Sequence, residues 1–193
     1  MEQSAIGKRR AALVALLKDP SEGVRIAAAC SLDRLEGIDS LEDLLEMLRR
    51  GNLASRIRAI YALGEVGGEK AISALVYCAS RPEEDLKAAA IEVLGNLTHP
   101  ATVPILVEKL KEPNTGLKAK AIRALGGFRD RSLVPLLVPF LGANDGLLEV
   151  EALLSLSRLG DSSLEGQFIE LASSTHPATR EAAAVALGRL PLT

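Results

Sequence analysis

The chain is poor in aromatic residues, with three Phe, two Tyr and no Trp among its 193 residues. A core with so few large rings is filled by Ala, Leu, Ile and Val, which suits helices that approach each other closely. The scarcity of rings also disfavours a protein that holds single-stranded nucleic acid by stacking bases on aromatic side chains.

No excess of positive charge is present, since the net charge is −2 and the isoelectric point is about 5.8. A general nucleic-acid binder needs a basic face that displaces counterions from the phosphates. The composition therefore predicts that nucleic acid is not a partner.

Long apolar runs and cysteines are scarce as well. No stretch reaches the ~18 apolar residues of a membrane span, and no apolar signal-peptide core follows the polar segment 1–10. Cys30 and Cys78 are the only cysteines and fall at different places in the chain. Free thiols in a reducing compartment are favoured over a disulfide, so we expect a cytoplasmic protein without membrane contact.

Residues that carry catalysis or bind metals are few. His99 and His176 are the only histidines, and both precede a proline. A zinc or iron site needs three or four ligands gathered in space, and the sequence has no His-Glu pair and no HExxH helix. Neither cysteine has a histidine near it in sequence, which disfavours a thiol nucleophile and leaves proximity in space open. We predict no catalytic residue, no metal site and no cofactor, and interpret both histidines as loop residues beside helix starts.

What is abundant is a repeat of 31 residues. Leucines recur at this interval, as Leu32, Leu63, Leu94, Leu125, Leu156 and Leu187. An alanine stands four positions before each leucine, as Ala28, Ala59, Ala90, Ala121, Ala152 and Ala183. A large apolar residue stands three positions after each, so the spacing i, i+4, i+7 marks one face of a helix. A fixed period of this length predicts a stack of helix pairs.

The period organises the chain into one predicted solenoid domain over residues 1–193. A lone helix at 4–18 precedes the repeats, and a lone helix at 178–190 follows them. The two-helix repeats span residues 22–50, 53–80, 83–111, 114–142 and 145–173. In the first repeat a turn at Gly37 is expected between the two helices. The lone helices are complementary halves of a repeat, so we expect a monomer or weak head-to-tail self-association.

The pattern Val-Arg-x-x-Ala-x-x-x-Leu at 24–32, followed by Leu-x-x-Leu-Leu-x-x-Leu at 41–48, resembles HEAT-like repeats. The nearest type is the short one of phycobilisome-lyase-type repeat proteins, and the resemblance covers nearly the whole chain. It implies an all-α fold, a right-handed α-α superhelix of the HEAT/armadillo-like solenoid class, with the second helices on the concave side. The family includes scaffolds, regulatory subunits and a few enzymes, so the resemblance leaves the function open.

Two further columns of the repeat and one proline carry predictions. A basic residue recurs, as Arg25, Arg56, Lys87, Lys118 and Arg180, and we expect hydrogen bonds from it to the preceding turns. Glu149 interrupts that column and should lack the usual partners. Glycines follow the leucine, as Gly64, Gly95, Gly126 and Gly188, and should admit the backbone of the next turn. Pro139 should kink its helix, either on the solvent side or so that the inner surface is reshaped.

The leading functional hypothesis is a non-catalytic scaffold or adaptor that binds a protein or peptide on the second helices. The alternative is a lyase-type enzyme or enzyme subunit related to bilin lyases, and it rests on the family resemblance alone.

The binding patch is predicted from helical geometry, because some positions of the second helices point away from the core. Apolar members gather in the middle repeats, as Tyr77, Ile105, Leu136 and Phe140. Charged residues surround them, as Glu46, Arg50, Arg81, Glu108 and Glu170. An apolar centre with a charged rim is typical of a protein-binding patch, with Tyr77 and Phe140 as anchors. In the alternative, the position that Phe140 shares with Met47 packs between neighbouring helices and is buried.

Overall fold

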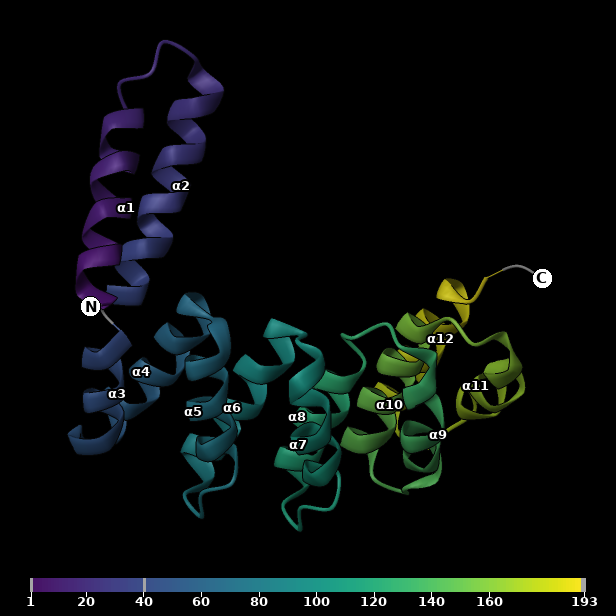
Figure 1. Cartoon of the computed structure of the whole chain (residues 1–193). Helices are drawn as coiled ribbons and strands as arrows, with labels where there is room; N and C mark the ends of the chain where they lie inside the picture. The colour runs from purple at the N-terminus through teal and green to yellow at the C-terminus, as the bar shows by residue number, and fades with distance from the viewer. Residues whose placement is uncertain (1, 40, 192–193) are drawn as a thin grey trace. The chain divides into compact units, whose positions relative to one another are not determined.

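The computed structural model of the protein describes residues 2–39 and 41–191, with side chains placed for 7–32, 35 and 41–191. Every regular element in these residues is a helix, which confirms the all-α prediction (Figure 1). None of the described helices is both long and apolar enough to span a membrane. The chain forms two compact units, residues 1–71 and 72–193, and each is described by itself. The single domain over 1–193 stays a prediction.

The first unit contains two packed pairs of helices. They are α1 (Glu2–Leu16) against α2 (Glu22–Asp39), and α3 (Leu41–Arg50) against α4 (Leu53–Val66). The amide side chain of Asn52 accepts a 2.9 Å hydrogen bond from the Ser55 N–H and so begins α4. The turn predicted at Gly37 is wrong, because α2 continues to Asp39. A single glycine weakens a helix by about 1 kcal/mol, and here it does not end one.

The second unit is built from alternating long and short helices. After α5 (Gly68–Ala79), which runs into this unit, come α6 (Glu84–Leu97), α7 (Val103–Lys109), α8 (Thr115–Leu125), α9 (Val134–Leu137), α10 (Gly146–Leu159), α11 (Glu165–Leu171) and α12 (Pro177–Arg189). Short 3-10 segments lie between them, as η1 (Pro100–Thr102), η2 (Arg131–Leu133), η3 (Val138–Gly142) and η4 (Ser162–Leu164). The helices follow the 31-residue period, so this unit is a helical solenoid.

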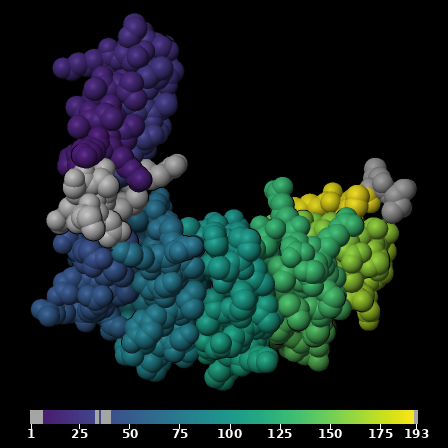
Figure 2. Space-filling model, viewed as in Figure 1, coloured from purple at the N-terminus to yellow at the C-terminus, as the bar shows by residue number. Residues whose placement is uncertain are grey.

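The long helices α6, α8, α10 and α12, which we call the first-helix row, pack one against the next. Figure 2 shows that successive repeats of this unit, from teal to yellow, lie directly against one another. In both units the alanine column is buried, as predicted for Ala28, Ala59, Ala90, Ala121, Ala152 and Ala183. Small side chains at these positions let the helices approach closely.

Glycine makes the closest contacts of the first-helix row. A Cβ atom on Gly95 would lie 2.5 Å from the Cβ of Ala124, and one on Gly126 would lie 2.4 Å from the Cβ of Ser155. The predicted close approach is therefore present at both glycines. The predicted neighbour is wrong, because each glycine meets the next first helix and not the following turn.

The short second helices begin with a repeated side-chain cap. The side chains of His99, Asp130 and Asp161, 31 residues apart, each accept a hydrogen bond from the backbone N–H two residues on. The N–H of Ser132 holds the pKa of Asp130 below its ordinary value. His99 is thus a loop residue at a helix start, as predicted, and a 3-10 turn precedes each of α7, α9 and α11.

Pro139 interrupts the second helix of its repeat. The α-helix α9 ends at Leu137, and the chain continues as the 3-10 segment η3 to Gly142. Proline has no N–H for the α-helical ladder, and its ring collides with the carbonyl group four residues earlier. The predicted disturbance at Pro139 takes the form of this change of helix type.

Candidate functional site

Two of the predicted partner-binding residues belong to the first unit. Glu46 and Arg50 are exposed on α3, and the Arg50 Nε lies 2.9 Å from the Glu46 Oε1. Exposed pairs of this kind contribute little to stability. Both charged groups remain accessible to a ligand.

Tyr77 is the most exposed of the predicted apolar residues, with 60% of its surface accessible on α5. The Nη1 of Arg81 donates a 3.1 Å hydrogen bond to its hydroxyl, and the guanidinium carbon lies 5.5 Å from the ring centroid. Arg81 is held in turn by the Glu83 carboxylate, 3.4 Å from Nε, which raises the pKa of Arg81 above its ordinary value. The Tyr77 ring is thus an exposed aromatic surface steadied by charged neighbours.

The remaining predicted residues differ in how exposed their side chains are. Leu136, Glu108 and Glu170 are exposed, and Phe140 is half-buried. Ile105 was predicted to face outward and is only 8% exposed, so it does not belong to an exposed patch. The patch in the second unit is therefore smaller than predicted.

The burial of Ile105 follows from a rotation of α7. Its buried stripe is Thr102, Ile105, Leu106 and Lys109, spaced i, i+3, i+4, i+7. The prediction placed Val103, Val107 and Leu110 inward, and these are half-buried. Thr102 can be buried because its hydroxyl donates to the His99 carbonyl at 2.8 Å. At the position shared with Met47 and Phe140, Cys78 and Lys109 are buried, which supports the alternative of sideways packing there.

Lys109 is buried because carboxylates surround its ammonium group. Its Nζ lies 3.0 Å from a Glu108 oxygen and 3.1 Å from a Glu112 oxygen, and Lys87 Nζ lies 2.9 Å from the other Glu112 oxygen. Burial alone would raise the pKa of Glu112, but the hydrogen bonds from Lys87 and Lys109 outweigh it and lower the pKa. Glu112 therefore links the end of α7 to α6.

The basic column behaves as predicted at three arginines. Arg25 donates to the carbonyl groups of Asp19 and Pro20, Arg56 to Leu48, and Arg180 to Ser174 and Thr175. Each guanidinium thereby fastens a first helix to the turn or helix end before it. Lys87 departs by binding Glu112, and Lys118 has no such contact among the described residues.

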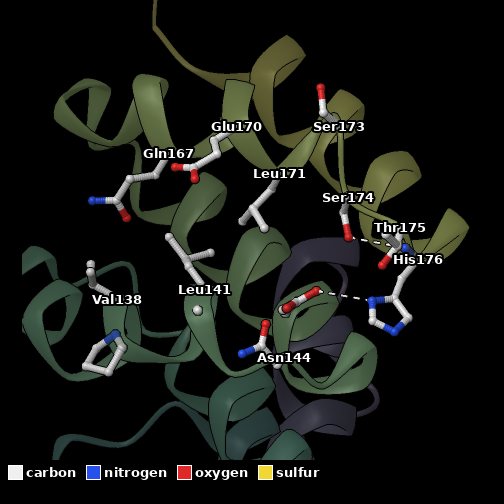
Figure 3. Close-up of a pocket in the computed structure, with 13 residues that line it drawn as sticks. Val138, Leu141, Asn144, Gln167, Glu170, Leu171, Ser173, Ser174, Thr175 and His176 are labelled. Carbon is white, nitrogen blue, oxygen red and sulfur yellow. Dashed lines mark hydrogen bonds and ion pairs between the residues drawn. The ribbon is translucent and has the colours of Figure 1, made fainter.

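Glu149, the acidic member of that column, is almost fully buried, with 5% of its surface accessible. Its Oε2 accepts a 2.9 Å hydrogen bond from the hydroxyl of Thr179, which is completely buried. The Nδ1 of His176 lies 4.0 Å from the same oxygen (Figure 3). Thr179 stands where the three preceding repeats carry Leu86, Leu117 and Leu148. The repeat pattern did not predict this contact, although Glu149 and Thr179 each depart from their column in successive repeats.

A pocket of about 790 Å³ opens beside Glu149. Its walls come from η3, the turn before α10, α11 and the turn before α12. In Figure 3, Leu141 and Leu171 lie in the middle of the pocket, with Gln167 and Glu170 toward one end and His176 toward the other. Pro139 also lines this pocket, so its 3-10 segment shapes a concave part of the surface.

Two predicted chemical properties can be compared with the described residues. Cys30 is exposed and Cys78 buried, and neither forms a disulfide. No group of three or more His, Cys, Asp or Glu side chains that could hold a metal ion occurs in the part of the chain that the structure describes.

A sequence model for HEAT repeats matches residues 41–117 and 103–165, which together cover more than half of the chain. No curated protein sequence matches.

Solved structures share the fold. YibA from E. coli matches with a TM-score of 0.62 and 20% identity, over 96% of this chain and 74% of that one. The complex of CpcE and CpcF of phycocyanin lyase from Nostoc sp. PCC7120 matches with 0.57 and 21%, over 93% and 76%. An engineered protein matches with 0.57 and 19%, over 94% and 96%. At these identities the likeness concerns the fold alone.

Proposed function

Because the chain belongs to the HEAT-repeat family, we propose that it is a non-catalytic scaffold that binds a protein or peptide segment on its second helices. The observation that carries this proposal is Tyr77. The residue is 60% exposed, and Arg81 contacts both its hydroxyl group and the face of its ring. A large side chain fixed before binding loses little conformational entropy when a partner covers it.

The charged neighbours support the same proposal. Arg81 and Glu83 lie beside the ring, and Glu108 is exposed on α7. An aromatic anchor with polar groups around it is the usual anatomy of a binding hot spot. HEAT repeats commonly mediate protein interactions, and one structural neighbour is itself a complex of two proteins.

The remaining parts of the proposal rest on composition. The net charge of −2 supports a protein partner over nucleic acid, and two cysteines that form no disulfide, Cys30 and Cys78, support a cytoplasmic location. Weak head-to-tail self-association stays a prediction, checked by sedimentation over a wide concentration range. No specific observation favours the lyase-type alternative, since the phycocyanin lyase complex shares only the fold.

A paired substitution tests the proposal. The protein is cross-linked in extract of its source cell, the captured protein is identified and purified, and its affinity is measured for the wild type, Tyr77→Ala and Tyr61→Ala. Tyr61 is the matched control, because it is also an exposed tyrosine but lies on α4, the first helix of its repeat. We expect Tyr77→Ala to weaken binding by about tenfold or more and Tyr61→Ala to leave it unchanged.

Two results would count against the proposal. Equal affinity of the two variants for the captured partner would place the binding surface elsewhere. Failure of the purified partner to bind the wild-type protein would remove the scaffold function itself.

A further inference from the structure

The pocket beside Glu149 lies at the repeat position that is occupied by arginine in the repeats of Arg25 and Arg180. In the repeat that follows, Arg180 donates to the carbonyl groups of Ser174 and Thr175, which lie six and five residues before it. Arg25 binds Asp19 and Pro20 with the same spacing. The corresponding turn before Glu149 is residues 143–144. A carboxylate cannot donate to carbonyl groups, and no other described side chain donates to that turn.

The carboxylate of Glu149 is itself only partly satisfied. Its Oε2 accepts from Thr179 and faces His176, whereas its Oε1 has no hydrogen-bond donor among the described residues. Oε1 is not among the described side-chain atoms that are both fully buried and without a hydrogen-bond partner, so it keeps access to solvent through the pocket. The arrangement thus leaves a carboxylate acceptor at the pocket, whose lining also includes Asn144 of the turn before α10.

We propose that this pocket binds the guanidinium group of an arginine side chain presented by a protein partner. The partner's guanidinium takes the place that the chain's own arginine occupies in the repeats of Arg25 and Arg180. It donates to the Glu149 carboxylate and to the adjacent turn. The inference rests on the proposed function, because it supplies the chemistry of one residue of the partner.

The lining of the pocket offers both apolar and acidic groups to an arginine side chain. Leu141 and Leu171 provide apolar surface for the three methylene groups of its stem, and Glu149 provides a buried negative charge for its head (Figure 3). Glu170 adds a second carboxylate to the lining. His176 and Arg180 are the basic groups nearby, and Arg180 is already engaged with two carbonyl groups.

Guanidinium is favoured over ammonium by the number and geometry of the acceptors. A guanidinium carries five N–H donors in a planar fork, so it can bind a carboxylate and carbonyl groups at once. A lysine ammonium has three donors around a single point. The repeats of Arg25 and Arg180 each show a guanidinium that donates to two turn carbonyl groups at this position.

The test uses a small probe, N-acetyl-arginine methylamide, titrated into the isotope-labelled protein and followed by NMR. We expect saturable shifts of the amide signals of residues 142–149 and 171–176, with a Kd on the order of 1 mM for a single side chain. The citrulline analogue, which has the same shape without the charge, should bind at least about tenfold more weakly. The lysine analogue should fall between the two.

Matched variants locate the effect. Glu149→Gln should weaken binding of the arginine probe about tenfold, and Glu149→Arg should abolish it by filling the place from within. Glu165→Gln is the control, because it makes the same charge change on α11 and does not line the pocket. Thermal melts of each variant verify that the fold is kept.

Several outcomes would overturn the proposal. These are equal binding of the citrulline analogue, unchanged binding by Glu149→Arg, an equal loss in Glu165→Gln, or shifts produced by Mg²⁺ or Ca²⁺ but not by the arginine probe. Such results leave the scaffold function intact if a partner still depends on Tyr77. Conversely, the arginine probe could bind in a way that depends on Glu149 while no partner's binding depends on Tyr77. In that case the assignment of the pocket stands and the proposed function fails.

Discussion

In the second unit, the first and second helices of each repeat have different structural roles. The first helices α6, α8 and α10 meet through buried alanines and through Gly95 and Gly126, whose backbones touch the next helix. The second helices α7, α9 and α11 are short and begin with 3-10 turns. Tyr77 on the longer α5, Leu136 on α9 and part of the wall of the pocket beside Glu149 belong to the second helices. Stacking is therefore fixed by one row, and the other row is free to vary its exposed groups.

Polar contacts reinforce this division. Between first helices, Arg123 forms a bidentate pair with the buried Glu151, and Lys120 Nζ lies 2.7 Å from a Glu92 oxygen. The second-helix end at Lys109 is tied back to α6 through Glu112. Both rows take part in ion pairs, and the first row adds the close backbone contacts at Gly95 and Gly126.

The largest effect is expected from enlarging the alanine column. Ala121→Leu should destabilise the protein by about 1–3 kcal/mol, because the side chain is fully buried and a larger one forces the helices apart. Ala90→Leu should behave alike. Chemical denaturation measures the change. Ala184→Leu, at an exposed position of α12, is the control, and equal stability of all three variants would show that our description of the row is incorrect.

The Glu112 network should give the next largest effect. Glu112→Gln should cost about 2 kcal/mol, because Lys87 and the buried Lys109 lose their shared carboxylate. Glu108→Gln removes an exposed partner of Lys109 and should cost less than about 0.5 kcal/mol. Urea unfolding of both variants distinguishes a shared ion pair from a simple loss of charge.

The same network predicts a dependence on pH. The pKa of Glu112 is lowered from 4.5 in the folded protein, so its contribution is complete above that value and is lost as the pH falls through the folded pKa. The stability difference between wild type and Glu112→Gln should therefore shrink in acid. A difference that stays constant from neutral pH to below the folded pKa would contradict the assigned role.

Adding one methyl group to a glycine separates close contact from helix propensity. Gly95→Ala should destabilise by about 1 kcal/mol, because its Cβ would lie 2.5 Å from the Cβ of Ala124. Gly188→Ala has nothing within 4 Å and should stabilise by about 0.5–1 kcal/mol. Thermal melts give the sign of each change, and equal signs would refute the assigned contact.

The smallest effect is expected on the second helices. Tyr77→Ala should change stability by less than about 0.5 kcal/mol, since the ring is mostly exposed. Circular dichroism melts provide the measurement. A loss comparable to that of Ala121→Leu would mean that Tyr77 supports the fold, and the contrast between the rows would disappear.

The sequence predicted the features that follow from the 31-residue repeat and from single residues such as proline. The buried alanines, the carbonyl contacts of Arg25 and Arg180 and the disturbance at Pro139 each follow from a local pattern. It did not predict that Ile105 turns inward, because polar Thr102 and Lys109 join the buried side only through partners brought by folding. Glu149 and Thr179 each depart from the residue type of their column, in successive repeats. The sequence alone does not show that they are in contact, because the hydrogen bond joins two different helices, α10 and α12.

The brevity of the second helices has a consequence for motion. α7, α9 and α11 have 7, 4 and 7 residues, against 14 and 11 in α6 and α8. A four-residue helix holds few internal hydrogen bonds, and these can open without separating the long helices. Amide hydrogens should therefore exchange faster with solvent in residues 134–142 than in residues 146–159. A ligand that binds residues 134–142 would therefore bind a segment that often opens locally, while the contacts between the long helices remain intact.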